Sequence, residues 1–588
     1  MMKGLWFFCK FGWRTDKKYI IYNVLYQLIH SLSPLVNVLL PKYIIDGLIT
    51  GKSPEYLFLC IGILAGYNFA ADSIANWLSL NVFTLRCKVA ADFGLYMHKK
   101  LAYADYENLE NPDFLDLKEK ANKFLYGDGR GFSYVFDSAL NIIGQFIALT
   151  SITVLILSLN VWLVLLLILL ILASSLVEHW AKKNELKLAL EQVKVERGWM
   201  YFGGLFENFI YGKEIRINSL ADWLLNKEKE YSRKAVTYYE RRNQFYIKSG
   251  FAASLMALLQ QCVAYAYLVY RTLEKAITIG DFTMYLGAVT AFSTAMHSIM
   301  SSFVDVKAYG IYYEAMQDYL DVPDKMRSNR HLPVPNGQYT LEFRGVSFRY
   351  AGQTNDTLKN INITLKPGEK LSVVGENGAG KSTFIKLLMR LYDPTEGVIL
   401  LDGINIKDID YDSYMSLFSA VFQDFKLFSF SLKDNISLSG TTNEVEMRQL
   451  LGRVGLSAKL NSLPEGIYTN INKEFDENGF EPSGGEGQKI ALARALFKNA
   501  PIIVLDEPAA ALDPKAEYEM YEHFNELVMG KTAVYISHRL SSARFCDTIA
   551  VFHNGEITEY GTHDELILIR GKYAELFRMQ AQYYTNIV

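Results

Sequence analysis

This 588-residue chain has little net charge and no cysteines at a spacing typical of disulfides or metal sites. Lys and Arg total 60 against 63 Asp and Glu, a formal net charge of -3, which gives no reason to expect a nucleic-acid partner. The five cysteines are scattered without paired spacing, so neither a disulfide framework nor a zinc site is indicated. No cleavable signal peptide is readable, because basic residues flank the short aromatic run in MMKGLWFFCKFGWRTDKKY.

Charged residues are also sparse in long stretches of the first 310 positions. A helix that crosses a bilayer needs roughly 20 mostly apolar residues. The stretch 138–177 contains 40 residues without a charged side chain, enough for two spans with a turn near Asn160. We therefore predict an α-helical membrane domain with six transmembrane helices, at about residues 19–41, 56–85, 133–158, 160–178, 249–271 and 281–305.

Lys and Arg gather in two segments between these predicted spans. Residues 86–132 hold eight of them and residues 178–248 hold fourteen, and an excess of basic residues marks cytoplasmic segments. Their composition is helix-like, so we expect the membrane helices to continue into the cytoplasm.

Polar side chains inside the predicted spans allow two interpretations. They are costly in lipid, which makes substrate contact one possibility, and amides that bridge neighbouring helices are the other. The residues concerned are His30, Asp72, Asn76, Asn141, Gln145, Gln260, Gln261 and His297.

A change of pattern follows the last apolar stretch. Three prolines and mixed charges mark residues 321–338 as a linker between a transmembrane domain, 1–320, and a second domain, 339–588. In the second domain a strand pattern leads into the loop GENGAGKST and then a helix, the context of a phosphate-binding loop. Its backbone N–H groups, its lysine and the helix N-terminus suit the phosphates of a nucleoside triphosphate. The predicted nucleotide-binding residues here are Gly375, Asn377, Gly378, Gly380, Lys381, Ser382 and Thr383.

A second motif supplies two carboxylates. The apolar run from Ile502 to Leu505 predicts a buried parallel strand, and Asp506 and Glu507 follow at the edge where ligands collect. Asp506 is predicted to hold Mg²⁺. Glu507 is predicted to accept the proton of an attacking water or to orient that water.

These motifs and those around them resemble the nucleotide-binding domain of ATP-binding-cassette (ABC) transporters. Together with the preceding helices, the whole chain resembles an exporter half-transporter: transmembrane helices followed by an α/β P-loop NTPase domain. The resemblance implies that Tyr350 in VSFRYAG stacks on adenine. It also implies that Gln423 contacts Mg²⁺ and the attacking water, and that His538 in VYISHRL contacts the γ-phosphate.

The resemblance completes the expected site. Catalysis is assigned to Glu507, His538 and Gln423, and the Mg²⁺ ligands to Ser382, Gln423 and Asp506, with ATP and Mg²⁺ as cofactors. The family's signature motif, which stands here as PSGGE, adds Ser483, Gly484 and Gly485 to the nucleotide-binding residues. The segment after the predicted strand 502–505 adds Asp513.

The signature motif departs from the usual family pattern at two letters. In PSGGE, Pro482 replaces a leucine and Glu486 replaces a glutamine, and their effect on ATP binding stays open. In the family each signature closes over the ATP of another domain, so a second half-transporter is expected. A homodimer is favoured, and the Glu507-bearing member of a heterodimer is the alternative.

The resemblance also predicts coupling and function. Two cytoplasmic segments, 103–121 and 211–224, occupy the places of coupling helices, and Glu214 and Asp222 are the expected coupling residues. The predicted function is ATP-driven export by alternating access across a bacterial plasma membrane. The exported substrate is unknown: an amphipathic small molecule, a lipid or a peptide. A nucleotide-gated channel or a regulatory ABC protein is the alternative.

Overall fold

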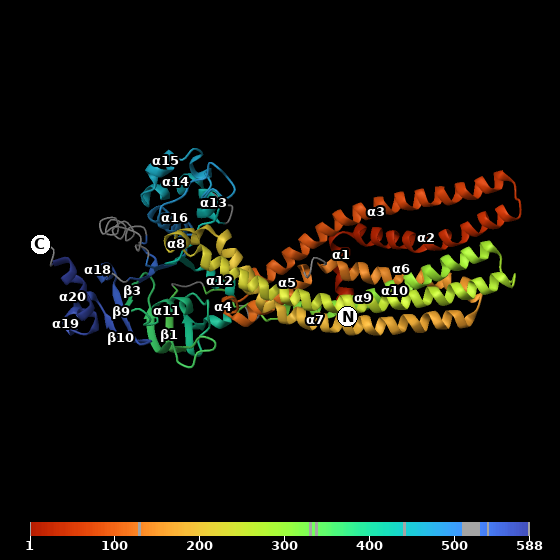
Figure 1. Ribbon diagram of the computed structural model, residues 1–588. Coiled ribbons are helices and arrows are strands. Elements are labelled where there is room, and N and C mark those ends of the chain that lie inside the picture. Colours follow the sequence, from red (N-terminus) through yellow and green to blue (C-terminus); the bar gives the residue numbers. More distant parts are fainter. Residues whose placement is uncertain are drawn as a thin grey trace. The chain divides into compact units, whose positions relative to one another are not determined.

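The computed structural model describes residues 2–126, 131–327, 332–335, 339–438, 443–507, 528, 530–537 and 540–585. These residues form two compact units (Figure 1). The first comprises Met1–Tyr103 and Pro112–Val322, and the second comprises Ala104–Asn111 and Pro323–Val588. The short segment Ala104–Asn111 therefore belongs to the second unit, although the residues on both sides of it in the chain belong to the first.

The first unit is helical, and its long helices run alongside one another (Figure 1). Its elements are α1 (Met2–Thr15), α2 (Lys17–Ile49), α3 (Pro54–Ala102), α5 (Pro112–Tyr126), α6 (Gly131–Leu157), α7 (Val161–Glu207), the 3-10 turn η2 (Phe209–Tyr211), α8 (Gly212–Ile217), α9 (Ala221–Leu273) and α10 (Ile279–Leu320).

Capping side chains begin several of these helices. The Asp16 side chain accepts a hydrogen bond from the backbone of α2, and Ser53 does the same for α3, where Pro54 takes the first helical position. Asn160 caps α7 after the break that follows α6. Thr278 and Asp281 form a reciprocal capping box at the start of α10.

Five helices among the described residues are long and apolar enough to cross a membrane by length and composition: α2, α3, α6, α7 and α9. Helix α10 contains the sixth predicted span but is not among them, so the count of six is not confirmed. Helices α3, α7 and α9 have 49, 47 and 53 residues. They are longer than the roughly 20 residues that a bilayer requires.

The first unit has its own apolar core. Buried side chains of α2, α6, α7, α9 and α10 pack together, including Ile152, Leu167 and Phe292. A buried ion pair accompanies them, in which Arg242 of α9 donates from Nε to Oε1 of Glu185 on α7 at 3.0 Å.

The second unit combines two sheets with surrounding helices. Its strands are β1 (Leu341–Phe348), β2 (Leu358–Leu365), β3 (Lys370–Gly375), β4 (Glu396–Leu401), β5 (Ile404–Asn405), β6 (Phe418–Val421), β7 (Ile502–Asp506), β8 (Thr532–Ile536), β9 (Thr548–His553) and β10 (Glu556–Gly561). Its helical elements are α4 (Tyr106–Glu110), α11 (Lys381–Leu388), η3 (Ile406–Asp408), α12 (Tyr411–Ser416), α13 (Leu432–Ser437), α14 (Glu444–Arg453), α15 (Ser457–Ser462), η4 (Gly466–Tyr468), α16 (Gly484–Phe497), α18 (Leu540–Ala543), α19 (His563–Ile569) and α20 (Lys572–Thr585).

The larger sheet positions the candidate site. Its strand order is β10-β9-β3-β8-β7-β6, and the smaller, antiparallel sheet has the order β2-β1-β4-β5. From β9 to β6 the larger sheet is parallel, with β10 antiparallel at the edge. The carboxyl ends of the parallel strands therefore share one edge, where α/β folds bind ligands.

Candidate nucleotide-binding site

The loop between β3 and α11 has a backbone that only glycine accommodates at two positions. Gly375 has φ +149°, and a Cβ there would lie 2.3 Å from the carbonyl oxygen of Phe552. Gly380 has φ +102°, and a Cβ there would lie 2.6 Å from Cδ2 of Leu358. This geometry leaves the N–H groups at the start of α11 available to an anion, with the positive end of the helix dipole behind them.

Lys381 begins α11 and places its ammonium group inside the loop. Its Nζ donates to the carbonyl oxygens of Gly375 and Glu376, both at 2.9 Å. Burial lowers the pKa of Lys381, and the charges of Glu507 and Asp506 offset part of that effect. The loop therefore holds a cation in the place where phosphates would bind.

Three predicted residues lie at the carboxyl ends of two neighbouring parallel strands. Asp506 ends β7, Glu507 comes next, and Gln423 follows β6. Gln423 donates from Nε2 to Oε2 of Glu507 at 2.9 Å. Burial, reinforced by the charge of Glu507, raises the pKa of Asp506 to about 6.

The backbone of Glu507 adopts the left-handed conformation, with φ +51°. This region is uncommon for residues other than glycine. Two hydrogen bonds hold the segment: the Glu507 N–H donates to the carbonyl oxygen of Ile536 on β8 at 3.0 Å, and Gln488 Nε2 of α16 donates to the Glu507 carbonyl at 3.4 Å. The turn directs the carboxylate away from the strand, toward Gln423.

A cavity of about 280 Å³ joins these elements. It is lined by Thr357, Asn377, Gly378, Gly380, Lys381, Ser382, Thr383, Gln423 and Glu507. The structure thus brings most of the predicted phosphate-loop residues together with Gln423 and Glu507, two of the predicted catalytic residues.

Thr357 is the lining residue that the sequence motifs missed. It lies just before β2, and its N–H donates to the carbonyl oxygen of Phe348 on β1 at 2.8 Å. The signal that could have identified it is its place in the same β1–β2 connection as Tyr350, which the motifs did single out.

Tyr350 is not a lining residue of this cavity but lies against α11. Its hydroxyl group is 3.1 Å from Oγ1 of Thr383. Its ring makes edge contacts with Phe348 and Tyr392, at centroid distances of 4.9 and 5.4 Å. The predicted adenine-stacking residue is therefore anchored to the phosphate-binding helix.

The signature residues Ser483, Gly484 and Gly485 stand at the start of α16, and among the described residues they do not line the cavity of their own chain. Ser483 caps the helix and forms a capping box with Glu486. The Ser483 N–H donates to Oε2 of Glu486 at 2.8 Å, and the Glu486 N–H donates to the Ser483 hydroxyl oxygen at 3.3 Å.

The two unusual letters of the signature have local explanations. The hydrogen bond from the Ser483 backbone, together with Lys459 at 3.3 Å, holds the pKa of Glu486 below its usual value. Its negative charge is therefore engaged inside the cap and by Lys459. Pro482 precedes the cap, where a missing N–H breaks no helical hydrogen bond.

The positions of four further predicted residues leave their roles untested. Asp513 and His538 lie outside the described residues. Glu214 lies in α8 and Asp222 in the first turn of α9, both in the first unit, and their coupling role stays a prediction.

Comparisons with known proteins agree with this geometry. A family model described as ABC transporter matches residues 358–510. The chain is 29% identical to the subtilin transport ATP-binding protein SpaT of Bacillus subtilis, over 92% of this chain and 88% of that protein. It is 28% identical to the ATP-dependent lipid A-core flippase of Bordetella avium, over 92% of this chain and 90% of the flippase. Residues 358–510 thus match the ABC transporter model, and the chain is similar to exporters of this kind over most of its length.

Two further comparisons cover almost the whole chain. It is 25% identical to the nisin transport ATP-binding protein NisT of Lactococcus lactis subsp. lactis, over 98% of this chain and 96% of that protein. Its fold matches a structure of a bacterial Atm1-family ABC exporter with ATP bound, with a TM-score of 0.81, 22% identity, and coverage of 96% of this chain and 98% of that chain. The family match and these relatives support an ATPase coupled to transport, and the candidate spans support a multi-pass membrane protein.

Two of the polar side chains predicted inside spans bridge neighbouring helices of the first unit. Asn141 of α6 donates to the hydroxyl oxygens of Ser298 and Ser302 on α10, at 2.7 and 2.9 Å. Gln260 of α9 donates to the carbonyl oxygen of Leu167 on α7 at 3.2 Å. For these two amides the bridging interpretation accounts for their presence.

Proposed function

We propose that this exporter works as a dimer of half-transporters that moves an amphipathic substrate across a bacterial plasma membrane by alternating access. The observation that carries the proposal is the cavity in which the phosphate loop, Gln423 and Glu507 converge, in a chain that also contains membrane-spanning helices.

In the proposed reaction the chain first binds and orients ATP. The N–H groups at the start of α11 and Lys381 hold the phosphates. The Gln423 amide, 2.9 Å from the Glu507 carboxylate, fixes that carboxylate in one orientation. Glu507 then orients the attacking water and accepts its proton.

The oxygen donors of the site suit Mg²⁺. Ser382 and Gln423 line the same cavity, and Asp506 supplies a carboxylate at the neighbouring strand end. Hydroxyl, amide and carboxylate oxygens are hard ligands of the kind that Mg²⁺ prefers. When bound, the ion would neutralise charge that develops on the phosphates.

Closure over ATP is proposed to require a second copy. Ser483, Gly484 and Gly485 do not line the described cavity of their own chain, so a signature from another protomer is free to complete it. The retained carboxylate at Glu507 supports a homodimer with two active sites. A heterodimer with a different half-transporter is the alternative.

The substrate class is proposed from the relatives. Two carry names that refer to subtilin and nisin transport, and one is named a lipid A-core flippase. Amphipathic peptides and lipids are therefore the first candidates. Stimulation of ATP hydrolysis by nisin, subtilin or lipid A core, each added to the exporter in nanodiscs, distinguishes them.

The decisive test is Glu507→Gln in the full chain in nanodiscs. We expect hydrolysis of ATP to fall by about two to four orders of magnitude, since general-base catalysis contributes a factor of that size, while binding of a fluorescent ATP analogue remains. Glu556→Gln, at an exposed carboxylate on β10, is the control and should hydrolyse ATP at the wild-type rate. Full activity of Glu507→Gln contradicts the mechanism, and an ATP-gated ion current in planar bilayers favours the channel.

A further inference from the structure

Helix α20 is attached to the rest of the second unit near both of its ends. At its start, the carboxylate of Glu559 on β10 accepts hydrogen bonds from the N–H groups of Lys572 and, at 3.0 Å, of Tyr573, and a negative charge is favourable at a helix N-terminus. Near its other end, Oε1 of Gln580 accepts a hydrogen bond from the N–H of Leu540 on α18 at 2.8 Å. The fold therefore determines where the first side chain of α20 lies.

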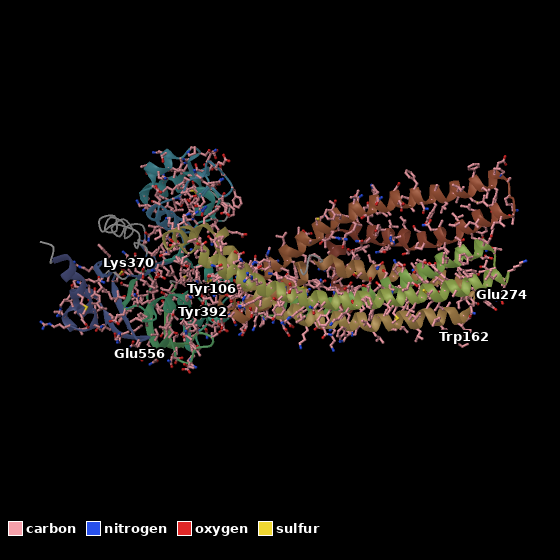
Figure 2. All side chains as sticks on the ribbon, viewed as in Figure 1. Tyr106, Trp162, Glu274, Lys370, Tyr392 and Glu556 are labelled. Atoms are coloured by element: carbon pink, nitrogen blue, oxygen red, sulfur yellow. The ribbon has the colours of Figure 1, made fainter. Side chains whose placement is uncertain are left out.

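This first side chain, Lys572, makes an ion pair with the phosphate loop. Its Nζ lies 2.9 Å from Oε1 of Glu376, the residue directly after β3, and 3.5 Å from Oε2 of Glu575 on α20. Strand β3 leads into the loop and strand β10 holds the start of α20; their first residues, Lys370 and Glu556, are labelled in Figure 2. The ion pair thus joins two segments that are far apart in the sequence.

The backbone of Glu376 holds the lysine of the phosphate loop. Its carbonyl oxygen accepts a hydrogen bond from Nζ of Lys381 at 2.9 Å and another from the N–H of Ala379 at 3.3 Å. The next residue, Asn377, lines the cavity. A side-chain contact that fixes Glu376 therefore also fixes a hydrogen-bond acceptor of Lys381.

The side chain of Glu376 brings a negative charge to a loop that is suited to a polyanion. The hydrogen bond from Lys572 and the positive charge of that lysine hold the pKa of Glu376 below its usual value, so the carboxyl group is ionised at neutral pH. An unpaired carboxylate here would repel the phosphates of a nucleoside triphosphate, and Lys572 neutralises it. The two side chains are 29% and 52% exposed, so salt in solution screens this effect.

We propose that Lys572 is a positioning residue of the nucleotide site, which neutralises the Glu376 carboxylate and holds the start of the phosphate loop in the form that binds ATP. It acts through Glu376 and takes no part in hydrolysis itself, so its effect belongs in the KM for ATP and not in kcat. This inference rests on the proposed nucleotide site and adds to it a residue that no sequence motif marks.

Steady-state hydrolysis of ATP by the full chain in nanodiscs tests this role, with KM and kcat measured at low and at high salt. The variants are Lys572→Ala, Glu376→Gln and the two changes together. Glu376→Gln removes the charge and leaves the backbone carbonyl that accepts from Lys381. Lys366→Ala is the matched control: this exposed lysine precedes β3, at the end of the strand away from the phosphate loop, and the described residues provide no hydrogen bond or ion pair for its side chain.

At low salt, Lys572→Ala should raise the KM for ATP by about two- to fivefold, the size expected of one exposed ion pair, and leave kcat close to that of the wild type. High salt should reduce this difference, because it screens the charge of Glu376. Adding Glu376→Gln should return the KM to that of Glu376→Gln alone, whereas a packing defect in α20 would persist. Lys366→Ala should match the wild type.

An unchanged KM in Lys572→Ala overturns the inference, as does a fall in kcat in place of a rise in KM. A raised KM that persists at high salt or in the double variant overturns it too. Failure of the nucleotide site itself is seen separately: a Lys381→Ala protein that binds a fluorescent ATP analogue as tightly as the wild type overturns that site, and this inference with it.

Discussion

Asp506 and Glu507 are adjacent carboxylates with different surroundings. Asp506 ends a buried strand and is half-buried, and its pKa is raised to about 6 by burial and by the charge of Glu507. Glu507 stands beyond the strand and accepts a hydrogen bond from Gln423. The position of Asp506 suits the binding of a cation in place of a proton. The position of Glu507 suits the acceptance of a proton from a water molecule.

We expect the affinity for ATP with Mg²⁺ to weaken as the pH falls below about 6. Asp506 takes up a proton in that range, and the proton must leave before the carboxylate can bind a cation. The apparent affinity should therefore drop by up to about tenfold per pH unit. Titration of a fluorescent ATP analogue at pH values on either side of 6 measures the effect.

Two controls isolate Asp506 in this titration. Replacing Mg²⁺ by EDTA should remove the step near pH 6, and Asp506→Asn should weaken binding at neutral pH and abolish the step. A wild-type affinity that stays constant across this range in the presence of Mg²⁺ would contradict the assignment.

Among the elements, the start of α16 shows what a carboxylate does in the signature motif. Ser483 and Glu486 exchange hydrogen bonds with each other's backbone. Serine followed three residues later by glutamate or glutamine is the pattern of a capping box. The glutamine of the usual motif and the glutamate found here can therefore support the same cap.

Glu486→Ala should destabilise the second unit by about 1 kcal/mol, the net contribution of one typical hydrogen bond, since it removes the acceptor of the Ser483 N–H and leaves the Ser483 cap in place, whereas Glu486→Gln should stay close to the wild type. Thermal unfolding of the full chain, followed by fluorescence, provides the comparison. Equal losses for Ala and Gln would show that charge, through Lys459, and not the cap, is what Glu486 contributes.

Helices α7 and α9 pack closely at Gly198, so a larger side chain there should be destabilising. A Cβ at Gly198 would lie 2.3 Å from Cε1 of Tyr231, so Gly198→Ala should destabilise the helical unit by about 1–3 kcal/mol. Gly204, on the same helix, has no such neighbour within 4 Å, and Gly204→Ala should be neutral or stabilising. Melting temperatures in detergent measure both, and a Gly198→Ala protein as stable as the wild type would refute the predicted clash.

The sequence predicted those parts of the site that consecutive residues encode. The phosphate loop needs a strand, glycines and a helix in unbroken order, and each can be read from neighbouring letters. The contact of Glu110 with Tyr392 could not be read, because the two residues are 282 positions apart and no local pattern pairs them. Thr357 was missed for a related reason: a single threonine before a strand carries no signal until the strand is placed beside the loop.

At the scale of the whole molecule, the fold class was predictable, because long apolar runs and a P-loop pattern separate cleanly along the chain. The count of six transmembrane helices is not confirmed. Helix α10 is 42 residues long, yet it is not among the described helices apolar enough to cross a membrane by composition. Residues 282–304 of this helix contain no Asp, Glu, Lys or Arg, but their Ser, Thr and His side chains lower the mean hydropathy, so composition alone does not identify the span.

A complementation experiment tests the proposed homodimer. Lys381→Ala damages the phosphate loop and Ser483→Arg damages the signature, so each variant alone should hydrolyse almost no ATP. In a mixed dimer one site combines the intact phosphate loop of one protomer with the intact signature of the other. Co-expression with two different affinity tags should therefore restore part of the activity in doubly purified dimers.

The double variant, with both changes in one chain, is the control for this experiment. Co-expressed with the wild type it leaves no site intact in a mixed dimer, and such dimers should be inactive. Doubly tagged dimers of the two single variants that show no recovery would argue for a different half-transporter as the partner.

The second unit also includes the eight residues Ala104–Asn111, which lie in the sequence between the two stretches of the helical unit. A gene fragment that starts at Pro323 would encode all of the sheets and the phosphate loop, yet it would leave Lys386 and Tyr392 without Glu110 and the Lys325 N–H without Asp105. Such a fragment should dissolve poorly and bind nucleotide less well than one fused to the short α4 peptide. Each unit is built from two separate stretches of the sequence. No single continuous gene fragment therefore encodes either unit alone and in full.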